Sequence, residues 1–124
     1  MGRKLKQLPA DNDDFIRKII ADPNYRVTER GTLETRNSVN GQGLMPKDRW
    51  REVGGFNSYG YRVYKPKIDG AQRNILIHRV VYAALIGTLD RRKVVNHKDG
   101  NRANNHPDNL ELVSWEYNGT YRAD

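Results

Sequence analysis

The chain has no cysteine, and only 36% of its residues are hydrophobic. Without thiols, neither a disulfide framework nor a thiolate zinc site can stabilise the fold. With 30% charged residues, the sequence predicts a small core that is surrounded by long polar loops. A length of 124 residues fits one compact domain rather than two.

Long apolar runs are also missing from the sequence. No segment approaches the roughly 20 apolar residues that a membrane-spanning helix needs. Residues 1–6 lead into no signal-type apolar region. We therefore expect an intracellular, soluble protein that has no membrane partner.

Positive charge, in contrast, is in excess, with a formal net charge of +7 at pH 7. Residues 61–102 carry 10 basic and 3 acidic side chains, whereas residues 103–124 carry 1 basic and 4 acidic ones. A positive field over the first of these segments would concentrate a polyanion, and its binding would depend on salt. The alternative is a solvated basic surface without a function.

The first half of the sequence predicts one helix and one hairpin. Apolar residues recur at helical spacing after residue 10, and the helix should stop at Pro23. Residues 25–28 and 32–35 flank Gly31 as two strands with a glycine at the turn. Residues 37–45 show no such pattern and are expected to form a loop.

Alternating polarity then predicts strands over residues 50–55 and 60–65, and a second hairpin that turns at residues 68–71 and returns over residues 74–77. Helical spacing resumes from His78, and Gly87 ends that segment. Four aromatic residues of this region are expected in the core between the strands: Trp50, Tyr59, Tyr61 and Tyr64.

The last third of the chain predicts strand, loop, strand and helix. Residues 94–97 and 110–113 are the strands, and the segment between them is rich in Asn, Asp and Gly, as a wide polar loop requires. Ser114 can cap a final helix over residues 115–121. This order would bring the end of the first strand close to the helix.

A histidine stands among asparagines at fixed intervals in this segment. Asn96 directly precedes His97, Asn109 follows His97 by 12 residues, and Asn118 follows Asn109 by 9. The spacing resembles that of the HNH endonucleases, specifically the homing-type branch found in phages and group I introns. A second similarity to these proteins runs from Tyr59-Gly60-Tyr61 to residues 77–81.

The resemblance implies an α+β fold, as a small single domain with β-hairpins and a C-terminal ββα-metal motif. Residues 1–10 would be a flexible basic arm, residues 11–58 an N-terminal helix and hairpin extension, and residues 59–124 the nuclease core. If a phage encodes the chain, the cytoplasm of the host cell is the expected location.

The resemblance also implies the roles of the motif residues. His97 would be the general base that activates water, and Asn96 and Asn118 would be ligands of one divalent metal ion, Mg²⁺ or Mn²⁺. Asn109 would brace the loop and orient the histidine by hydrogen bonds. The position of Asn96 is often an aspartate in the family, and two neutral ligands would hold Mg²⁺ weakly.

The implied function is a metal-dependent endonuclease that hydrolyses phosphodiester bonds of double-stranded DNA. A monomer would nick one strand, and a homodimer would place two sites across the duplex. The alternative is a catalytically weak, HNH-derived DNA-binding module, and a basic RNA-binding protein would lack a stacking platform. Phosphate contacts are assigned to basic residues before and around the histidine: Arg73, Arg79, Arg91, Arg92, Lys93, Lys98 and Arg102.

The other two histidines are assigned to structural roles. His78 begins a predicted helix, where packing or hydrogen bonding is the usual role, and His106 belongs to a surface loop. By residue type these two and His97 could bind zinc, but their spacings of 19 and 9 residues match no zinc pattern. Asp99 and Glu116 are interpreted as a turn residue and a helix N-terminal residue rather than as metal ligands.

Overall fold

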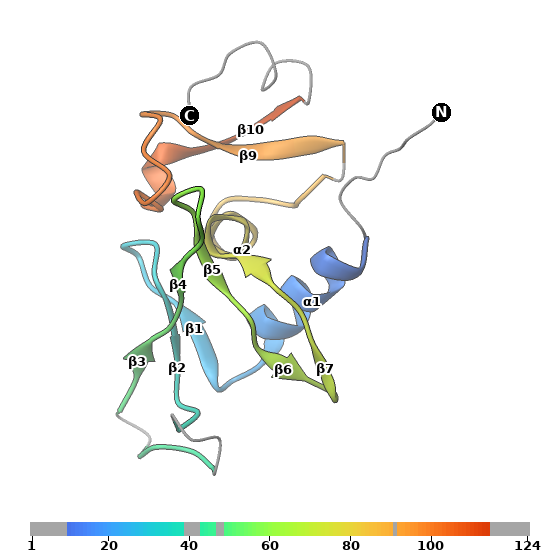
Figure 1. The fold of residues 1–124 in the computed structure, drawn as a ribbon, viewed down its shortest axis with the longest axis vertical. Helices are drawn as coiled ribbons and strands as arrows, with labels where there is room; N and C mark the ends of the chain where they lie inside the picture. The colour runs from blue at the N-terminus through green and yellow to red at the C-terminus, as the bar shows by residue number, and fades with distance from the viewer. Residues whose placement is uncertain (1–9, 39–42, 47–48, 91, 115–124) are drawn as a thin grey trace.

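The computed structural model of the chain describes residues 10–38, 43–46, 49–90 and 92–114. Figure 1 shows helix α2 (Ile77–Leu85) between the β9–β10 hairpin on one side and the remaining strands and helix α1 (Ala10–Ala21) on the other. The predicted α+β class with several β-hairpins is confirmed. The predicted final helix with Asn118, the arm over residues 1–9 and Arg91 lie outside the described residues.

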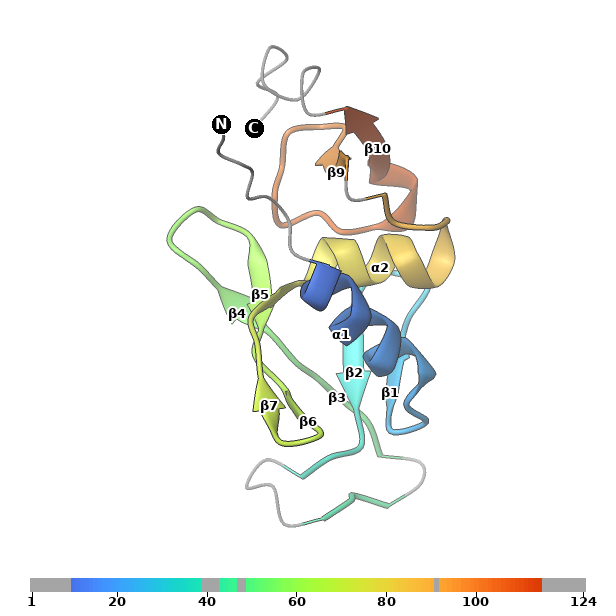
Figure 2. The same ribbon diagram turned by 90° about the vertical axis from the view of Figure 1, so that its right-hand side faces the viewer.

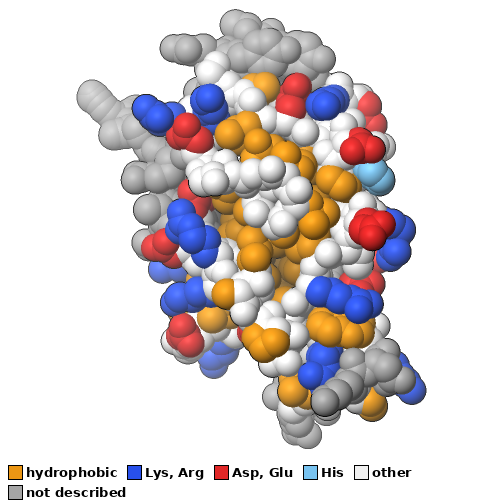
Figure 3. All heavy atoms as spheres, turned by 180° about the vertical axis from the view of Figure 1, so that it is seen from behind, with side chains coloured by type: hydrophobic (Ala, Val, Ile, Leu, Met, Phe, Trp, Pro, Cys, Tyr) orange, Lys and Arg blue, Asp and Glu red, His pale blue; other side chains and the backbone are white. Residues whose placement is uncertain are grey.

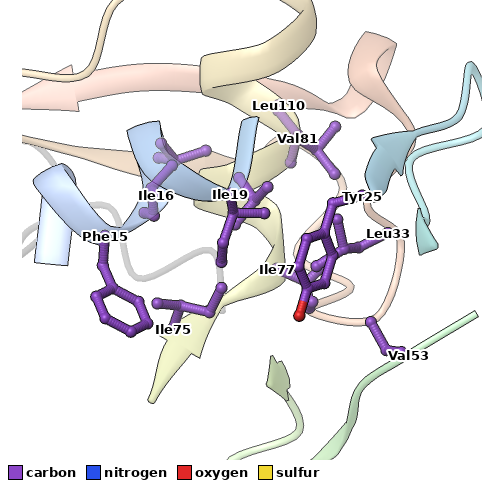
Figure 4. Packing of buried hydrophobic residues seen from close by; sticks show 12 residues of the cluster. Phe15, Ile16, Ile19, Tyr25, Leu33, Val53, Ile75, Ile77, Val81 and Leu110 are labelled. Atoms are coloured by element: carbon purple, nitrogen blue, oxygen red, sulfur yellow. The ribbon is translucent and has the colours of Figure 1, made fainter. Parts of the chain in front are cut away.

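The two helices form the centre of the core because their apolar residues share one face. In α1, Ile16 and Ile19 are 1% and 0% exposed, and in α2, Val80 and Val81 are both fully buried. Figure 4 shows these helices packed against residues of the strands, including Leu110. The core thus draws on residues from both ends of the chain and ties the β9–β10 hairpin to the helices.

The helices are not completely covered by the described residues. Ile20, near the end of α1, and Leu85 and Ile86, at the end of α2, are exposed. Hydrophobic side chains gather at the centre of the face opposite that of Figure 1, with charged side chains around them (Figure 3). Within the described residues, no helix has the length and apolar character to cross a membrane.

The N-terminal sheet confirms the first predicted hairpin and adds a strand. Strand β1 (Tyr25–Val27) pairs antiparallel with β2 (Leu33–Thr35), and β3 (Arg51–Glu52) pairs with the other edge of β2. Gly31 in the β1–β2 turn has a φ of 88°, which favours glycine. The third strand was not predicted as a partner because such pairing depends on tertiary contacts.

A second sheet holds β4 (Gly55–Phe56), β5 (Arg62–Tyr64) and β8 (Ile75–Leu76) in the order β4-β5-β8. The predicted second hairpin is present as the antiparallel pair of β5 and β8, and its tip adds β6 (Lys67–Ile68) and β7 (Ala71–Gln72). Figure 2 shows the β6–β7 tip in the half of the molecule that lies away from β9.

The predicted core position of four aromatic residues is only partly correct. Tyr64 packs against the core, and Trp50 is half-buried beneath the guanidinium of Arg26, 4.4 Å from its ring centroid. Tyr59 is 70% exposed, because it lies in the turn between β4 and β5 rather than in a strand. Tyr61 is half-buried beside two histidines.

The C-terminal hairpin confirms the predicted strand, loop and strand. Strand β9 (Lys93–His97) pairs antiparallel with β10 (Leu110–Ser114), and His97 stands opposite Leu110. A 3₁₀ helix, η1 (Pro107–Asn109), leads from the loop into β10. This register places the last residues of β9 beside the loop and over α2 (Figure 1).

Candidate active site

His97 is the last residue of β9 and is 3% exposed. Its Nε2 atom lies 2.8 Å from Oδ1 of Asn105, which is itself 6% exposed. Asn105 could not be recognised from the sequence, because it is one of several asparagines in the polar loop and only the folded loop turns it toward the imidazole.

Two further rings enclose the imidazole of His97. The ring of His78, at the start of α2, has its centroid 4.7 Å from that of His97. The ring of Tyr61 stacks on His78 at 5.3 Å and lies 6.0 Å from His97. The guanidinium carbon of Arg102 lies over the Tyr61 ring, 4.8 Å from its centroid. Nη1 of Arg102 donates a hydrogen bond of 2.6 Å to the carbonyl oxygen of Tyr59.

His78 therefore contacts the site, beyond the packing role assigned from the sequence. Burial, and then the neighbouring His97 and Arg79, lower its pKa from 6.5 to about 3. Its buried Nδ1 has no hydrogen-bond partner among the described residues. The imidazole is neutral at physiological pH, so the base faces an uncharged ring on this side.

Asn96 is 4% exposed and stands opposite Glu111 in the hairpin. Its Nδ2 donates a hydrogen bond of 2.9 Å to Oε2 of Glu111. The amide nitrogen is thus occupied, and Oδ1 is the atom left to act as a ligand. Glu111 was missed at the sequence level because its position opposite Asn96 follows from the strand register.

An amide oxygen is a ligand that Mg²⁺ and Mn²⁺ accept, so Oδ1 of Asn96 fits a divalent cation, while Glu111 holds the amide through its nitrogen. Asn118, the other predicted ligand, lies outside the described residues. Among the described residues, no group of three or more His, Cys, Asp or Glu side chains could hold a metal ion. The donor set is therefore poor in charge and gives no support to a zinc triad.

Asn109 fastens the loop between the strands. Its Nδ2 donates to Oδ1 of Asp99 and to the carbonyl oxygen of Asn104, each at 2.9 Å. Its own Oδ1 accepts from the backbone amide of Asp99 at 3.1 Å. The side chain of Asn104, the amide of Asn101 and the side chain of Asn109 donate to Asp99 and hold its pKa below the usual value. Asp99 thus acts as the turn residue that the sequence predicted.

The basic residues assigned to phosphate contacts differ in their surroundings. Arg79 is 5% exposed and forms an ion pair with the buried Asp13 of α1, so its assignment to DNA is wrong. A guanidinium that stabilises the helix contact cannot also reach a phosphate. Arg102 is half-buried and bound to the β4–β5 turn. The exposed members of the set are Arg73, Arg92, Lys93 and Lys98.

His106 is exposed, as predicted, and its Nδ1 accepts a hydrogen bond from the backbone amide of Asp108 at 3.1 Å. His97 at the end of β9 and His78 at the start of α2 thus lie together in the site, whereas His106 lies at the surface. His106 is useful as a control position because its ring lies outside the site.

A family model described as HNH endonuclease matches residues 76–120, which include β9, the loop and β10. The chain is 33% identical over 104 residues to YosQ, named as an SPbeta prophage-derived HNH homing endonuclease of Bacillus subtilis. This match covers 84% of the chain and 55% of that relative. An uncharacterized HNH endonuclease of Acanthamoeba polyphaga mimivirus is 30% identical over 105 residues, with 85% of the chain and 28% of that relative covered.

The H-N-H endonuclease F-TflI of Escherichia phage T5 is 40% identical over 58 residues, which are 44% of the chain and 30% of that relative. The chain thus spans about half or less of the length of these curated relatives. Among solved structures, the HNH homing endonuclease I-HmuI, studied for DNA binding and cleavage, has the same fold. The TM-score is 0.65 at 22% identity, and the match covers 86% of the chain and 55% of that structure.

Proposed function

Because residues 76–120 place the chain in the HNH endonuclease family, we propose that it is a metal-dependent DNA endonuclease of the homing type. The observation that carries the proposal is the pair of neighbours at the end of β9. His97 and Asn96 are both buried, and each is held by a hydrogen bond, His97 to Oδ1 of Asn105 and Asn96 to Oε2 of Glu111. Such fixed polar groups are what a reaction centre requires.

His97 is the proposed general base. A neutral imidazole takes a proton from water, whose oxygen then forms a bond to phosphorus while one phosphorus–oxygen ester bond of the DNA strand breaks. The proton goes to the imidazole and the electron pair of the broken bond goes to the leaving oxygen. Asn96 would hold one divalent ion through Oδ1, together with Asn118. That ion supplies positive charge for the phosphorane and the leaving oxygen when it is bound.

Asn109 contributes to this reaction through the loop, since it holds the turn at Asp99 and the carbonyl of Asn104. Double-stranded DNA is the proposed substrate. Exposed Lys93 and Lys98 lie at the two ends of β9, where they can contact phosphates on either side of the reacting one. The DNA binding and cleavage described for I-HmuI support DNA as the substrate.

The test is conversion of supercoiled plasmid to open-circular and linear forms at about pH 8 with Mg²⁺, Mn²⁺ or EDTA. We expect wild-type protein to nick in the presence of metal, and His97→Ala to lose activity by roughly 10²- to 10⁴-fold. His106→Ala is the matched control and should nick as wild type does, because that ring lies outside the site. Open circles without linear product would support action of a monomer, and direct linearisation would support a homodimer.

The second candidate function is a DNA-binding module without efficient cleavage. Asn96 favours it, because a neutral amide neutralises no charge on a bound cation. No cutting by wild type or His97→Ala, with plasmid still shifted on a gel, would support this candidate and exclude the nuclease.

The metal preference follows from the same amide. A neutral ligand set binds Mg²⁺ weakly, and Mn²⁺ has the higher intrinsic affinity for mixed ligands. We expect faster plasmid nicking in Mn²⁺ than in Mg²⁺ at equal concentration. Equal or slower rates in Mn²⁺ would contradict this expectation.

A further inference from the structure

Asn105 is a buried polar residue that the motif spacing does not include. It lies in the loop after β9, is 6% exposed, and places Oδ1 at 2.8 Å from Nε2 of His97. A buried hydrogen bond to an imidazole does more than hold the ring, because the two ring nitrogens are chemically distinct.

We propose that Asn105 is the positioning residue of the site and selects the tautomer of His97. An amide oxygen has lone pairs and no proton, so the contact forms only when Nε2–H of the imidazole donates to it. A neutral imidazole carries one ring proton, and the lone pair therefore resides on Nδ1. The catalytic consequence rests on the proposed function: Nδ1 is the atom that takes the proton from water.

The loop is built to keep Asn105 in this place. The turn between β1 and β2 lies against its backbone, since a Cβ atom on Gly31 would stand 1.9 Å from the carbonyl oxygen of Asn105. Next to it in the loop, Asn104 donates to Oδ2 of Asp99 at 2.9 Å. Asn105 is thus held by a neighbour in the loop and by a segment distant in sequence.

The other neighbours of His97 restrict the plane of its ring. The rings of His78 and Tyr61 lie with centroids 4.7 Å and 6.0 Å from that of His97. Ring contacts of this kind limit tilting, but they do not distinguish one ring nitrogen from the other. The hydrogen bond from Nε2 to Asn105 does, and the site needs both kinds of restraint.

The test reads the tautomer directly, by long-range proton–nitrogen correlation spectra of the histidine rings in nitrogen-15-labelled protein at about pH 8. The signals of His97 are assigned by their loss in His97→Ala. We expect the Nε2–H tautomer in the wild type and in Asn105→Asp, whose carboxylate oxygen accepts the same hydrogen bond. Asn105→Ala should give a mixture of tautomers, and His106→Ala should leave the His97 signals unchanged.

Plasmid nicking provides the second readout. In Asn105→Ala we expect kcat to fall roughly 10- to 100-fold with KM for plasmid unchanged, and Asn105→Asp should recover part of the loss. A proton on Nδ1 in the wild type, or the same tautomer in wild type and Asn105→Ala, would overturn the proposal. The spectra need no turnover, so the expected tautomers in a protein that does not nick would instead overturn the proposed function.

Discussion

The pKa of His78 differs strongly between the folded and the unfolded chain. Burial, and then His97 and Arg79, lower its pKa to about 3 in the fold, whereas an unfolded chain has a value near 6.5. Asp13 of α1 faces Arg79, and the ring of Tyr61 stacks on the ring of His78. Between these two pH values the unfolded state binds the additional proton, so the fold loses stability as the pH falls.

We therefore expect the free energy of unfolding to decrease from pH 7 to pH 4 more steeply in the wild type than in His78→Phe. One group with this shift changes the free energy of unfolding by up to ~1.4 kcal/mol per pH unit. The change occurs between the folded and the unfolded pKa of the group and is absent above the unfolded pKa. Urea denaturation at a series of pH values measures the difference. Parallel curves for wild type and His78→Phe would contradict the prediction.

The two helices are joined by a buried ion pair, and this is the main polar contact between elements of the core. Asp13 of α1 and Arg79 of α2 are 2% and 5% exposed. Removal of one member leaves an uncompensated charge in the core, which is more costly than the absence of the pair.

Asp13→Ala should lower the free energy of unfolding by about 3–5 kcal/mol. The double variant Asp13→Leu with Arg79→Met should be markedly more stable than Asp13→Ala, because apolar side chains of similar volume replace the pair. Chemical denaturation of the three proteins gives the comparison. A double variant as unstable as Asp13→Ala would mean that the helices need the ion pair itself.

The β1–β2 hairpin touches the site through its turn, and Gly31→Ala tests that contact. The substituted Cβ would meet the backbone of Asn105 at 1.9 Å, and the φ of 88° adds strain. Gly43→Ala is the matched control, since its φ is 125° but no heavy atom of the described residues lies within 4 Å of the new Cβ. Both substitutions introduce backbone strain, and one of them also displaces the loop.

We expect Gly31→Ala to change the ring signals of His97 and to reduce plasmid nicking by roughly 10-fold or more, while Gly43→Ala changes neither. Thermal unfolding of both variants measures their loss of stability, so that it can be distinguished from displacement of Asn105. Equal effects of the two substitutions on nicking would show that strain alone, and not displacement of Asn105, is responsible.

Elements with a local signal could be predicted from the sequence, and contacts between elements could not. The helical spacing of α1 and α2 and the alternation of β9 and β10 are properties of short segments, and the structure confirms them. The interval between His97 and Asn109 identified the loop. Glu111 and Asn105 were missed because their partners depend on strand register and on the course of the loop.

Burial was the other quantity that the sequence left open. We expected an exposed Arg79 and a buried Tyr59, and the structure shows the opposite: the arginine is buried and the tyrosine is exposed. A guanidinium enters the core only because Asp13, which is 66 residues away in the chain, lies opposite it. Tyr59 leaves the strand pattern because Asn57 Oδ1 accepts from the amides of Tyr59 and Tyr61 and forms the turn there.

At the scale of the whole molecule, β9 and the β6–β7 hairpin lie in opposite halves (Figures 1 and 2). Lys93 begins β9, and Lys98 directly follows His97 at its other end. Lys67 lies in β6, and Lys18 of α1 donates to Asp69 in the turn after β6. All four lysines are exposed, so pairs of them can be exchanged for glutamine with the same change in net charge.

If DNA lies across β9, substitution of Lys93 and Lys98 will change the salt dependence of DNA binding, and substitution of Lys18 and Lys67 will not. Each phosphate contact adds about 0.9 to the slope of log affinity against log salt, so Lys93→Gln with Lys98→Gln should reduce the slope by about 2. Lys18→Gln with Lys67→Gln should leave it unchanged. Fluorescence anisotropy of a labelled duplex in EDTA at several salt concentrations measures both slopes. Equal slopes for the two double variants would show that DNA binding depends on net charge alone and that DNA does not lie over β9. The reason is that a lysine changes the slope through its own contact with a phosphate, which releases counterions.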